Sequence, residues 1–299
     1  MPALPFQKGQ ALGNDYLVVD RADLSFEFTP ALARALCDRH RGAGSDGVLI
    51  ADLSDGFELR IMNPDGSPAE KSGNGLRIFA AYLHGRGLVG NEWFEVALVK
   101  DRVRMRVEEA LGGGVLQIRA EMGRASFDGR DIGFHRVQSN EGAASNPGEV
   151  LGERLALEGG DEAEITTVSL ANPHCVVFVD ALDRADFLLR APQLCTHVAF
   201  AAGTNVQFAR VKSPHDLEAW IWERGVGETL ASGSSACAVA AAAVRRGFVQ
   251  PGTFTVHMQG GEAEVEVAPD YFVRLRGPAQ IVYAGEVSGP VVEGWRGVG

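Results

Sequence analysis

The stretch that most constrains the fold is residues 223–247, where a charged pair runs into a Gly/Ser-rich turn and then into an alanine-rich segment. Residues 232–235 are small and mostly hydroxylic, which is typical of a helix start, and residues 236–244 are strong helix formers. The sequence Arg-Arg-Gly at 245–247 is a stop signal. Because the first turn of a helix has unbonded N–H groups and a positive dipole end, the stretch predicts a helix start that binds a carboxylate or phosphate.

A second stretch of the same design lies upstream, at residues 70–87. Its turn, Ser72-Gly73-Asn74-Gly75, opens a segment that we expect to be a helix ending near Gly85 or Gly87. One chain therefore carries two small-residue turns, and each of them leads into a helix.

Composition limits the possible partners. The chain has 299 residues, of which 45% are hydrophobic, enough for one large core or two of ordinary size. Its formal net charge is −11, and its pI of about 5.2 is acidic. Nucleic acids and anionic membranes favour clustered Lys and Arg, so neither is expected as a partner. A small anionic substrate stays possible, because local arginines and helix starts act at short range.

From the N-terminal sequence, the apolar runs and the cysteines we expect a soluble, cytoplasmic protein. The first residues show no basic head followed by an apolar run, and the longest apolar run, residues 236–244, is too short to cross a bilayer. The cysteines are widely spaced, without the spacing of a zinc site, so we expect reduced, buried thiols and no metal. They are Cys37, Cys175, Cys195 and Cys237.

Two matches to G-x-G-x-x-G, at residues 42–47 and 85–90, are expected to be accidental. A dinucleotide fingerprint follows a strand and opens a helix. The first match instead follows a predicted helix and precedes a strand, and the second lies at a helix exit. We therefore expect no nicotinamide or flavin cofactor.

Hydrophobic alternation predicts a chain rich in strands. Helices are expected at residues 29–41, with Thr29 as cap and Pro30 at the first position, and a short turn or helix at 192–198. The polar region 126–164, especially 138–148, is expected to mark the passage into a second half. Strands are expected at 6–20 with a turn at 13–15, and at 48–50, 57–62, 96–106, 115–121, 175–179, 203–208, 217–223, 252–257, 262–267, 271–277 and 281–287.

The motifs resemble those of the diaminopimelate epimerase family of cofactor-independent amino-acid racemases, in the same order and from about Phe6 to the last strands. Besides the two helix starts, they are Gly13-Asn14-Asp15-Tyr16, Asn63-Pro64-Asp65-Gly66-Ser67, Asn172-Pro173-His174, Thr204-Asn205-Val206 and Glu223-Arg224-Gly225. The resemblance implies an α+β fold of two similar lobes, each a mostly antiparallel sheet or barrel around a central helix, with the active site in the cleft between them. The expected lobes are residues 1–122 with 279–299, and residues 123–278.

The resemblance also implies the site residues, an amino-acid substrate, no cofactor and a possible homodimer. The residues implied to be catalytic are Ser72, Ser232, His174 and Glu223. The residues implied to bind substrate are Asn14, Asn63, Gly73, Asn74, Asn172, Asn205, Glu223, Arg224, Gly233 and Ser234.

The chain departs from the family at both catalytic turns. Members of the family carry cysteine where this chain has Ser72 and Ser232. A cysteine pKa near 8.5 falls further at a helix N-terminus, whereas a serine hydroxyl has no such accessible anion and needs a neighbouring base. Many members also carry Gln at the position of Gly47, so the resemblance implies that this chain lacks one polar substrate contact.

Several functions therefore stay open. The chain is a diaminopimelate epimerase-like isomerase, a racemase of another small amino acid or hydroxy acid in which His174, Glu223 or Lys71 assists a serine, or an amino-acid-binding homologue without turnover. A serine hydrolase using Ser72 or Ser232 with His174 is disfavoured, because the chain has no G-x-S-x-G elbow.

Overall fold

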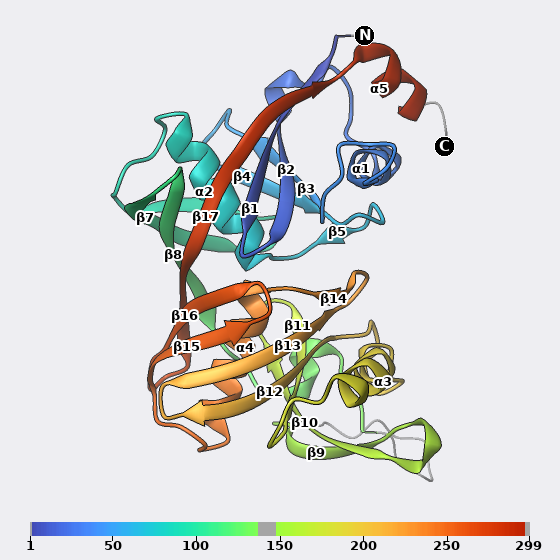
Figure 1. Cartoon of the computed structure of the whole chain (residues 1–299), viewed down its shortest axis with the longest axis vertical. Coiled ribbons are helices and arrows are strands. Elements are labelled where there is room, and N and C mark those ends of the chain that lie inside the picture. Colours follow the sequence, from blue (N-terminus) through green and yellow to red (C-terminus); the bar gives the residue numbers. More distant parts are fainter. Residues whose placement is uncertain (1, 137–147, 297–299) are drawn as a thin grey trace. The chain divides into compact units, whose positions relative to one another are not determined.

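The computed structural model describes residues 2–136 and 148–296 of the chain. The chain forms two compact units, unit 1 with residues 1–121 and 276–299 and unit 2 with residues 122–275. Both units combine many strands with a few helices, so the expected α+β class is confirmed (Figure 1). The chain passes from one unit to the other within two strands, β8 (Val115–Arg124) and β17 (Phe272–Val287).

Unit 1 contains the N-terminal strands and both chain ends. Besides β8 and β17, its elements are β1 (Leu4–Ala11), β2 (Asn14–Asp20), η1 (Arg21–Asp23), α1 (Pro30–Cys37), β3 (Val48–Asp52), β4 (Glu58–Met62), β5 (Pro68–Ala69), α2 (Gly73–Gly85), β6 (Phe94–Ala97), β7 (Arg102–Gly112) and α5 (Gly289–Arg296).

Unit 2 contains the central part of the chain. Its elements are η2 (Gly129–Ile132), β9 (Leu151–Ala156), η3 (Glu158–Gly160), β10 (Glu162–Ser169), β11 (Pro173–Phe178), α3 (Arg184–Cys195), β12 (Asn205–Ser213), β13 (Asp216–Glu223), β14 (Gly227–Thr229), α4 (Gly233–Arg245), β15 (Gly252–Met258) and β16 (Gly261–Val267).

The two units repeat one topology. In unit 1, β2 pairs antiparallel with β1 and parallel with β3, β3 pairs antiparallel with β4, and β4 pairs with the short β5 and parallel with β6. In unit 2, β11 likewise pairs antiparallel with β10 and parallel with β12, and β12 pairs antiparallel with β13. Strand β13 pairs with the short β14 and parallel with β15. A helix connects each parallel pair, as such a crossover requires. The expectation of two similar lobes is confirmed.

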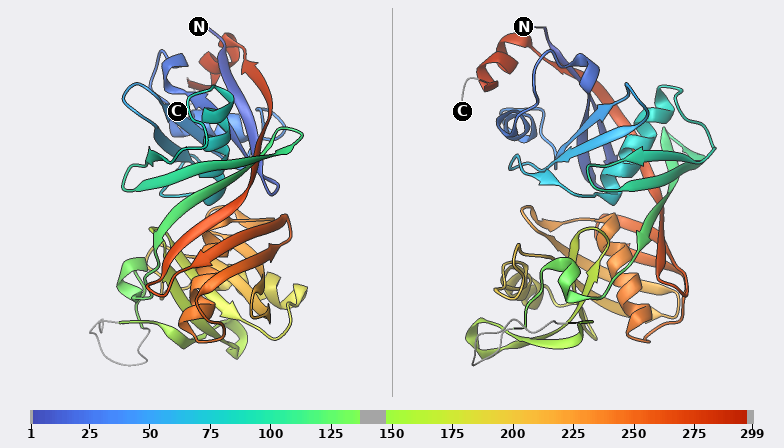
Figure 2. Two further views of the ribbon diagram at one scale, coloured as in Figure 1. Left: turned by 90° about the vertical axis from the view of Figure 1, so that its left-hand side faces the viewer. Right: turned by 180° about the vertical axis from the view of Figure 1, so that it is seen from behind.

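Each unit is built around one buried helix. All residues from Gly73 to Leu83 of α2 are buried, as are all residues from Gly233 to Val244 of α4. A helix that is buried on every side must be surrounded by the strands of its own core. Helix α2 accordingly packs against β1, β2, β3 and β7, and α4 against β10–β13, β15 and β16 (Figure 2). The predicted central helices are therefore confirmed, with Ser72 and Ser232 as their N-caps.

The other helices pack within their own units, α1 against α5 and β3, and α3 against β12 and β13. Leu32 and Leu36 of α1 share a buried cluster with Val292 of α5. In unit 2, the ring of Phe187 on α3 packs edge to face against Phe208 and Trp220 of the sheet. Aromatic pairs of this geometry stabilise a core beyond the area that they bury.

Two helix predictions need correction. Helix α1 has the predicted cap and first residue but ends at Cys37 rather than at residue 41, because the Asp38 carboxylate accepts the N–H groups of His40 and Arg41, both at 2.8 Å. Helix α3 starts far earlier than the expected segment 192–198, because Asp183 caps it by accepting the N–H of Asp186 at 2.8 Å.

Two strand predictions also need correction. The expected strand 96–106 is two strands, β6 and β7, separated by a turn in which the N–H of Leu98 bonds the carbonyl of Asp101. The expected strands 271–277 and 281–287 are one strand, β17, which continues through Pro278. Most of the predicted polar passage at 138–148 lies outside the described residues.

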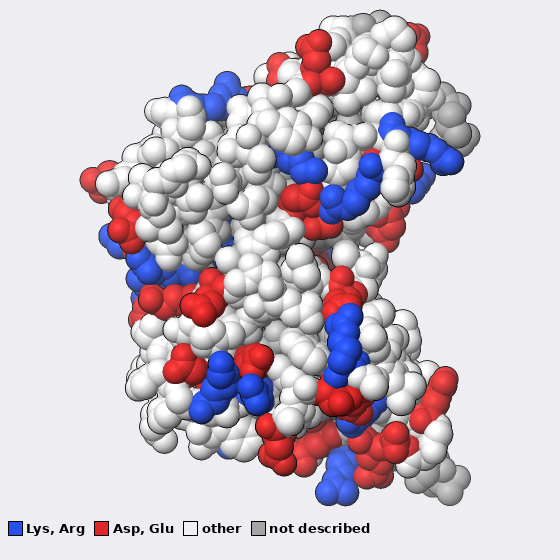
Figure 3. All heavy atoms as spheres, viewed as in Figure 1, with Lys and Arg blue, Asp and Glu red and all other residues white. Residues whose placement is uncertain are grey.

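Charges of both signs alternate over the surface in view (Figure 3). Many of them are paired, and Glu108 alone bonds three arginines, Arg106, Arg119 and Arg276. In the described part of the chain, no helix is long and apolar enough to span a bilayer. The same residues contain no group of three or more His, Cys, Asp or Glu side chains arranged to hold a metal ion.

Candidate active site

Ser72 is half-buried at the start of α2. Its Oγ accepts the N–H of Gly75 at 3.0 Å, the bond of a helix cap. Gly75 leaves room for this cap, because a Cβ there would lie 3.1 Å from Leu49 Cδ2 and 3.3 Å from Ser72 Oγ. The hydroxyl of Tyr16 lies 3.2 Å from the same Oγ. Ser72 therefore has a helix N–H and a phenol as neighbours.

Tyr16 was not among the predicted site residues. Its signal was available, because side chains two residues apart in a strand share a face. Asn14, two residues before it in β2, was predicted to bind substrate, and Tyr16 lies on the same face.

A chain of hydrogen bonds fixes the two predicted asparagines of unit 1. Asn74 Nδ2 donates to Asn14 Oδ1 at 3.0 Å, and Asn14 Nδ2 donates to Asp46 Oδ2 at 2.8 Å. Arg77, which is fully buried, donates from Nη2 to Asn74 Oδ1 at 2.7 Å. Since a guanidinium only donates and the carboxylate accepts, both amides are held in one orientation.

The far end of this chain is a cluster of opposite charges. Asp15 bonds Lys8 at 2.7 Å and Arg39 at 2.7 Å, and Arg39 also bonds Asp46 at 2.7 Å. Burial opposes ionisation of Asp15, but the bonds from Arg39 and Lys8 outweigh it and lower its pKa. For Asp46, burial and the nearby Asp15 charge raise the pKa.

Asn63 lies directly after β4, in the predicted turn. Its side-chain Nδ2 donates to Ser67 Oγ at 3.0 Å, and its backbone N–H donates to the carbonyl of Ser67 at 2.8 Å. Asn63 is only partly buried. The turn thus holds the amide at the end of the strand, still accessible to a ligand.

Ser232 caps α4 in the same way, although at longer distances. Its Oγ lies 3.5 Å from the N–H of Ser235 and 3.5 Å from Ser234 Oγ, and the residue is only 3% exposed. Gly233 and Ser234 are also buried. Both predicted catalytic serines therefore stand at the N-terminus of a helix of 13 residues.

His174 is the second residue of β11 and is fully buried. Its Nδ1 lies 3.1 Å from Gln207 Nε2 and its Nε2 lies 2.9 Å from Asn172 Oδ1. With the two amides oriented in this way, Nδ1 accepts and the proton is on Nε2. Burial, together with the positive charge of Arg224, lowers the pKa of His174 to about 3. The imidazole is therefore neutral at pH 7, and both of its nitrogens are hydrogen-bonded.

Asn172 connects His174 to the start of α4. While Oδ1 accepts from the imidazole, Nδ2 donates to Ser234 Oγ at 3.3 Å. Gln207 in turn donates to Ser235 Oγ at 3.0 Å. The first turn of α4 is thus held by the same polar group as the imidazole.

Asn205, Arg224 and Glu223 lie together at the ends of β12 and β13. Asn205 Nδ2 donates to the carbonyl of Pro173 at 2.9 Å, and Asn205 Oδ1 accepts the N–H of Arg224 at 3.0 Å. The Arg224 guanidinium bonds the carbonyl of Ala202 at 3.1 Å. Glu223 is the last residue of β13 and is half-buried.

The positions of these residues match between the units. Leu17 pairs with Val48 in unit 1 as Cys175 pairs with Val206 in unit 2. In the repeat, Asn14 is therefore equivalent to Asn172, and Tyr16 is equivalent to His174. Ser72 and Ser232 are each the N-cap of the second α-helix of their unit. The bond between Asn14 and Asn74 recurs as the bond between Asn172 and Ser234.

The cysteines do not replace the serines in this arrangement. All four are buried thiols, and Cys175 belongs to the core cluster of unit 2, as its predicted orientation away from His174 requires. Burial raises the pKa of Cys37 to about 11 and raises that of Cys175 further. Lys71, next to Ser72, is buried in an ion pair with Asp101 at 2.8 Å.

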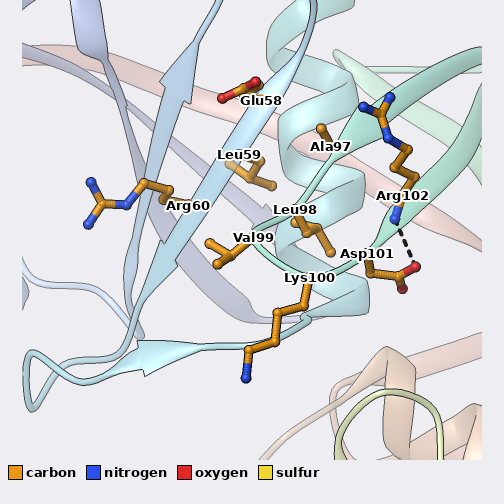
Figure 4. A pocket seen from close by; sticks show the side chains of 9 residues that line it. All are labelled: Glu58, Leu59, Arg60, Ala97, Leu98, Val99, Lys100, Asp101 and Arg102. Atoms are coloured by element: carbon orange, nitrogen blue, oxygen red, sulfur yellow. Dashed lines mark hydrogen bonds between the residues drawn. The ribbon is translucent and has the colours of Figure 1, made fainter.

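A surface hollow of about 780 Å³ lies beside this ion pair, between the ends of β4 and β6 (Figure 4). It is lined by charged side chains of both signs, among them Arg60 and Lys100, and by aliphatic side chains, of which Val99 is exposed. None of the predicted site residues lines it. This hollow therefore does not belong to the candidate site.

The fold is that of known epimerases and racemases. The chain is similar to a predicted epimerase from Pseudomonas aeruginosa, with a TM-score of 0.66, 20% identity and coverage of 95% of this chain and 99% of that one. It is also similar to a hydroxyproline epimerase from Agrobacterium vitis, with a TM-score of 0.69, 14% identity and coverage of 96% and 93%.

Sequence comparison defines the family more narrowly. The family model described as diaminopimelate epimerase matches residues 6–127 and 166–282. A diaminopimelate epimerase of Pelotomaculum thermopropionicum is 40% identical over 94% of this chain and 98% of its own length, and diaminopimelate epimerase 2 of a Nostoc strain is 37% identical over 95% and 96%. The chain belongs to the diaminopimelate epimerase family.

Proposed function

We propose that this protein is an isomerase that inverts one α-carbon of diaminopimelate, interconverting the LL and meso forms without a cofactor. The observation that carries the proposal is the repeated helix start: Ser72 and Ser232 cap equivalent helices in a chain of this family. The names of relatives that align over nearly the whole chain support the choice of substrate.

The chemistry requires two groups that exchange a proton with opposite faces of one carbon. It also requires stabilisation of a carbanion next to a carboxylate. In the proposal, Ser72 and Ser232 are those two groups, and the N–H groups of Gly73, Asn74, Gly233 and Ser234 bind the reacting carboxylate as helix N-termini bind anions.

The remaining predicted residues are proposed to hold the substrate. Arg224 is suited to the distal carboxylate, because a guanidinium binds such a group through two bonds. Glu223 is suited to an ammonium group or to assist Ser232. Asn14, Asn63, Asn172 and Asn205 carry amides suited to the polar groups of an amino acid, and His174, as a neutral donor, is proposed to orient Asn172.

The serines favour a second candidate, a racemase of another small amino acid or hydroxy acid. Serine is a weaker acid than cysteine, so its proton transfer is slower and is better suited to a substrate whose α-proton is more acidic. An amino-acid-binding protein without turnover is the third candidate. A hydrolase is not supported, because the imidazole of His174 bonds Asn172 and Gln207.

The test follows α-deuteration by NMR when purified protein is incubated in D2O with LL- or meso-diaminopimelate and with a panel of amino and hydroxy acids. We expect exchange with diaminopimelate that Ser72→Ala or Ser232→Ala lowers by roughly 10²-fold or more. Exchange only with another compound would reassign the substrate. Thermal stabilisation by amino acids without any exchange would indicate the binding protein.

The proposal extends to a cytoplasmic location and a homodimer. The buried thiols of all four cysteines fit a reducing compartment. The dimer is the expectation from the resemblance to the family. Sedimentation equilibrium of the purified chain, of 31.9 kDa, distinguishes a dimer from a monomer.

A further inference from the structure

The phenol beside Ser72 is the feature that the proposed function leaves unexplained. Tyr16 is only 7% exposed, and its hydroxyl oxygen lies 3.2 Å from Ser72 Oγ. Either oxygen can donate the shared proton. The Ser72 oxygen also accepts the N–H of Gly75, which leaves it able to exchange a proton with the phenol and with a ligand.

Gly47 provides the space that the ring of Tyr16 occupies. A Cβ at Gly47 would lie 2.6 Å from Tyr16 Cε1 and 2.7 Å from the carbonyl oxygen of Met62, distances that no side chain tolerates. The backbone of Gly47 is not left-handed, so space rather than conformation requires the glycine. The ring of Tyr16 therefore occupies space that any side chain at position 47 would need, and only glycine at that position leaves the ring where it lies.

Among the residues of unit 2 that the structure describes, Ser232 has no such phenol partner. The residue at the place of Tyr16 is His174, and its ring nitrogens bond Asn172 and Gln207. Ser232 has Ser234 Oγ as its hydroxylic neighbour, at 3.5 Å. The phenol is thus specific to Ser72, and the two serines differ in their partners although the units repeat one topology.

We propose that Tyr16 is the positioning residue that makes Ser72 competent, by sharing its proton. The inference rests on the proposed function, in which Ser72 exchanges a proton with the substrate α-carbon. When the carbanion takes the proton of Ser72 Oγ, the Cα–H bond forms with the electron pair of the carbanion. In the same step Ser72 Oγ takes the proton of the Tyr16 hydroxyl, and Tyr16 becomes the phenolate.

In the reverse direction the same two proton transfers are reversed. The phenolate of Tyr16 takes the proton of Ser72 while Ser72 takes the α-proton, and the electron pair of the broken Cα–H bond stays on carbon. The charge in this scheme rests on a phenol, with a reference pKa of about 10, and not on an alkoxide. The pair thus supplies the acidity that a lone serine lacks.

The experiment is a double-mutant cycle of Tyr16→Phe with Ser72→Cys, read as kcat and KM for α-deuteration of diaminopimelate. In the natural background we expect Tyr16→Phe to lower kcat by roughly 10²-fold or more, with KM changed by less than about 3-fold. In the Ser72→Cys background we expect less than about a 3-fold change, because a thiol with a pKa of about 8.5 carries its own charge.

Tyr82→Phe is the matched control, because its phenol bonds Asp20 and Arg86 elsewhere on α2. We expect it to change kcat by less than about 2-fold, and circular dichroism checks that both variants fold. Equal losses in both backgrounds, or no loss in the natural one, would overturn the role of Tyr16 while Ser72→Ala still tests the proposed function. Natural protein without exchange would overturn both.

Discussion

At the scale of single residues, the amide of Asn14 is held more firmly than its small size suggests. It is 4% exposed, with Asp46 on its nitrogen side and Asn74 on its oxygen side. Because Arg77 fixes Asn74 from beneath, reversal of either amide would set two donors or two acceptors against each other. The network therefore presents one defined pattern of polar groups at the start of α2.

Asn14→Asp tests this network. The new carboxylate would lie 2.8 Å from Asp46 Oδ2, where the donor now lies. We expect a loss of about 1–3 kcal/mol in the free energy of unfolding at pH 7, measured with urea. At pH 5 the loss shrinks, because one of two close carboxyls takes up a proton. The double variant Asn14→Asp with Asp46→Asn again pairs a donor with an acceptor, so we expect it to regain part of the lost free energy of unfolding. A double variant no more stable than Asn14→Asp alone would contradict the assigned orientation of the amide.

His174 gives a second prediction, about pH. Its pKa of about 3 in the folded chain lies below the unfolded value of about 6.5, so between these values the unfolded chain binds more protons. Stability contributed by the neutral imidazole is therefore present above about pH 6.5 and lost as pH falls toward 3, by roughly 1.4 kcal/mol per pH unit. Urea unfolding from pH 7.5 to 4.5 measures the slope.

The control for this prediction is His174→Gln, which removes the titrating group and keeps a polar side chain. We expect the variant to be less stable at pH 7.5 but to lose less stability on acidification. An unchanged slope would show that another group causes it.

At the scale of elements, the two central helices use different side chains for one task. Ala238 and Val239 of α4 hold the positions that Ile78 and Phe79 hold in α2, counted from the serine cap. Both helices are nevertheless buried along all but their last one or two residues. The strands around each helix are therefore packed to different side-chain volumes, and the shared feature is the capped start.

The strands of unit 1 are tied by Glu108 on β7. Its carboxylate bonds Arg119 Nε on β8 at 2.7 Å and Arg276 Nε on β17 at 2.6 Å, besides Arg106 at 2.8 Å in its own strand. Burial opposes ionisation, but the three guanidinium groups outweigh it and lower the pKa of Glu108 to about 2. One carboxylate thus connects three neighbouring strands.

Glu108→Gln is expected to lower the free energy of unfolding by about 1 kcal/mol at pH 7, measured with urea, because charge-assisted bonds are lost from a largely buried group. Because the pKa of Glu108 is lower in the folded chain than its value of about 4.3 in the unfolded chain, the ionised carboxylate stabilises the fold above about pH 4.3. This contribution to stability is lost as the pH falls from about 4.3 toward about 2. The difference from the natural chain therefore narrows between pH 5 and 3. A difference that is constant with pH would exclude the ion pairs as its cause.

At the scale of the whole molecule, one supersecondary design occurs twice in a single chain. Glu58 pairs with Ala97 in unit 1, and Glu218 pairs with His257 in unit 2, both 160 residues later. Ile61 with Ala69 and Ile221 with Thr229 repeat the same interval. The repeat extends from these strands through the capped helices, yet the residues that carry chemistry, Tyr16 and His174 among them, differ between the units.

The sequence by itself determined the features that depend on near neighbours. The two capped helix starts follow from small hydroxylic residues ahead of apolar segments, and most strands follow from alternation with a period of two. The motifs around Asn63, His174 and Arg224 indicated the family through their order. These signals are local, so they survive without knowledge of the fold. The C-terminal end of α1, the start of α3 and the continuity of β17 were mispredicted where local signals were weak or competing.

Only the tertiary structure decided which side chains meet. Tyr16 reaches Ser72 across 56 residues of sequence, and Asn74 reaches Asn14 across 60. The burial that keeps His174 neutral likewise depends on how the strands and helices of unit 2 pack around it. Contacts of this kind follow from packing between elements, because no local propensity specifies which distant residue closes a hydrogen bond. The acid and base partners of a serine are therefore a property of the folded chain, whereas its place at a helix start is a property of the sequence.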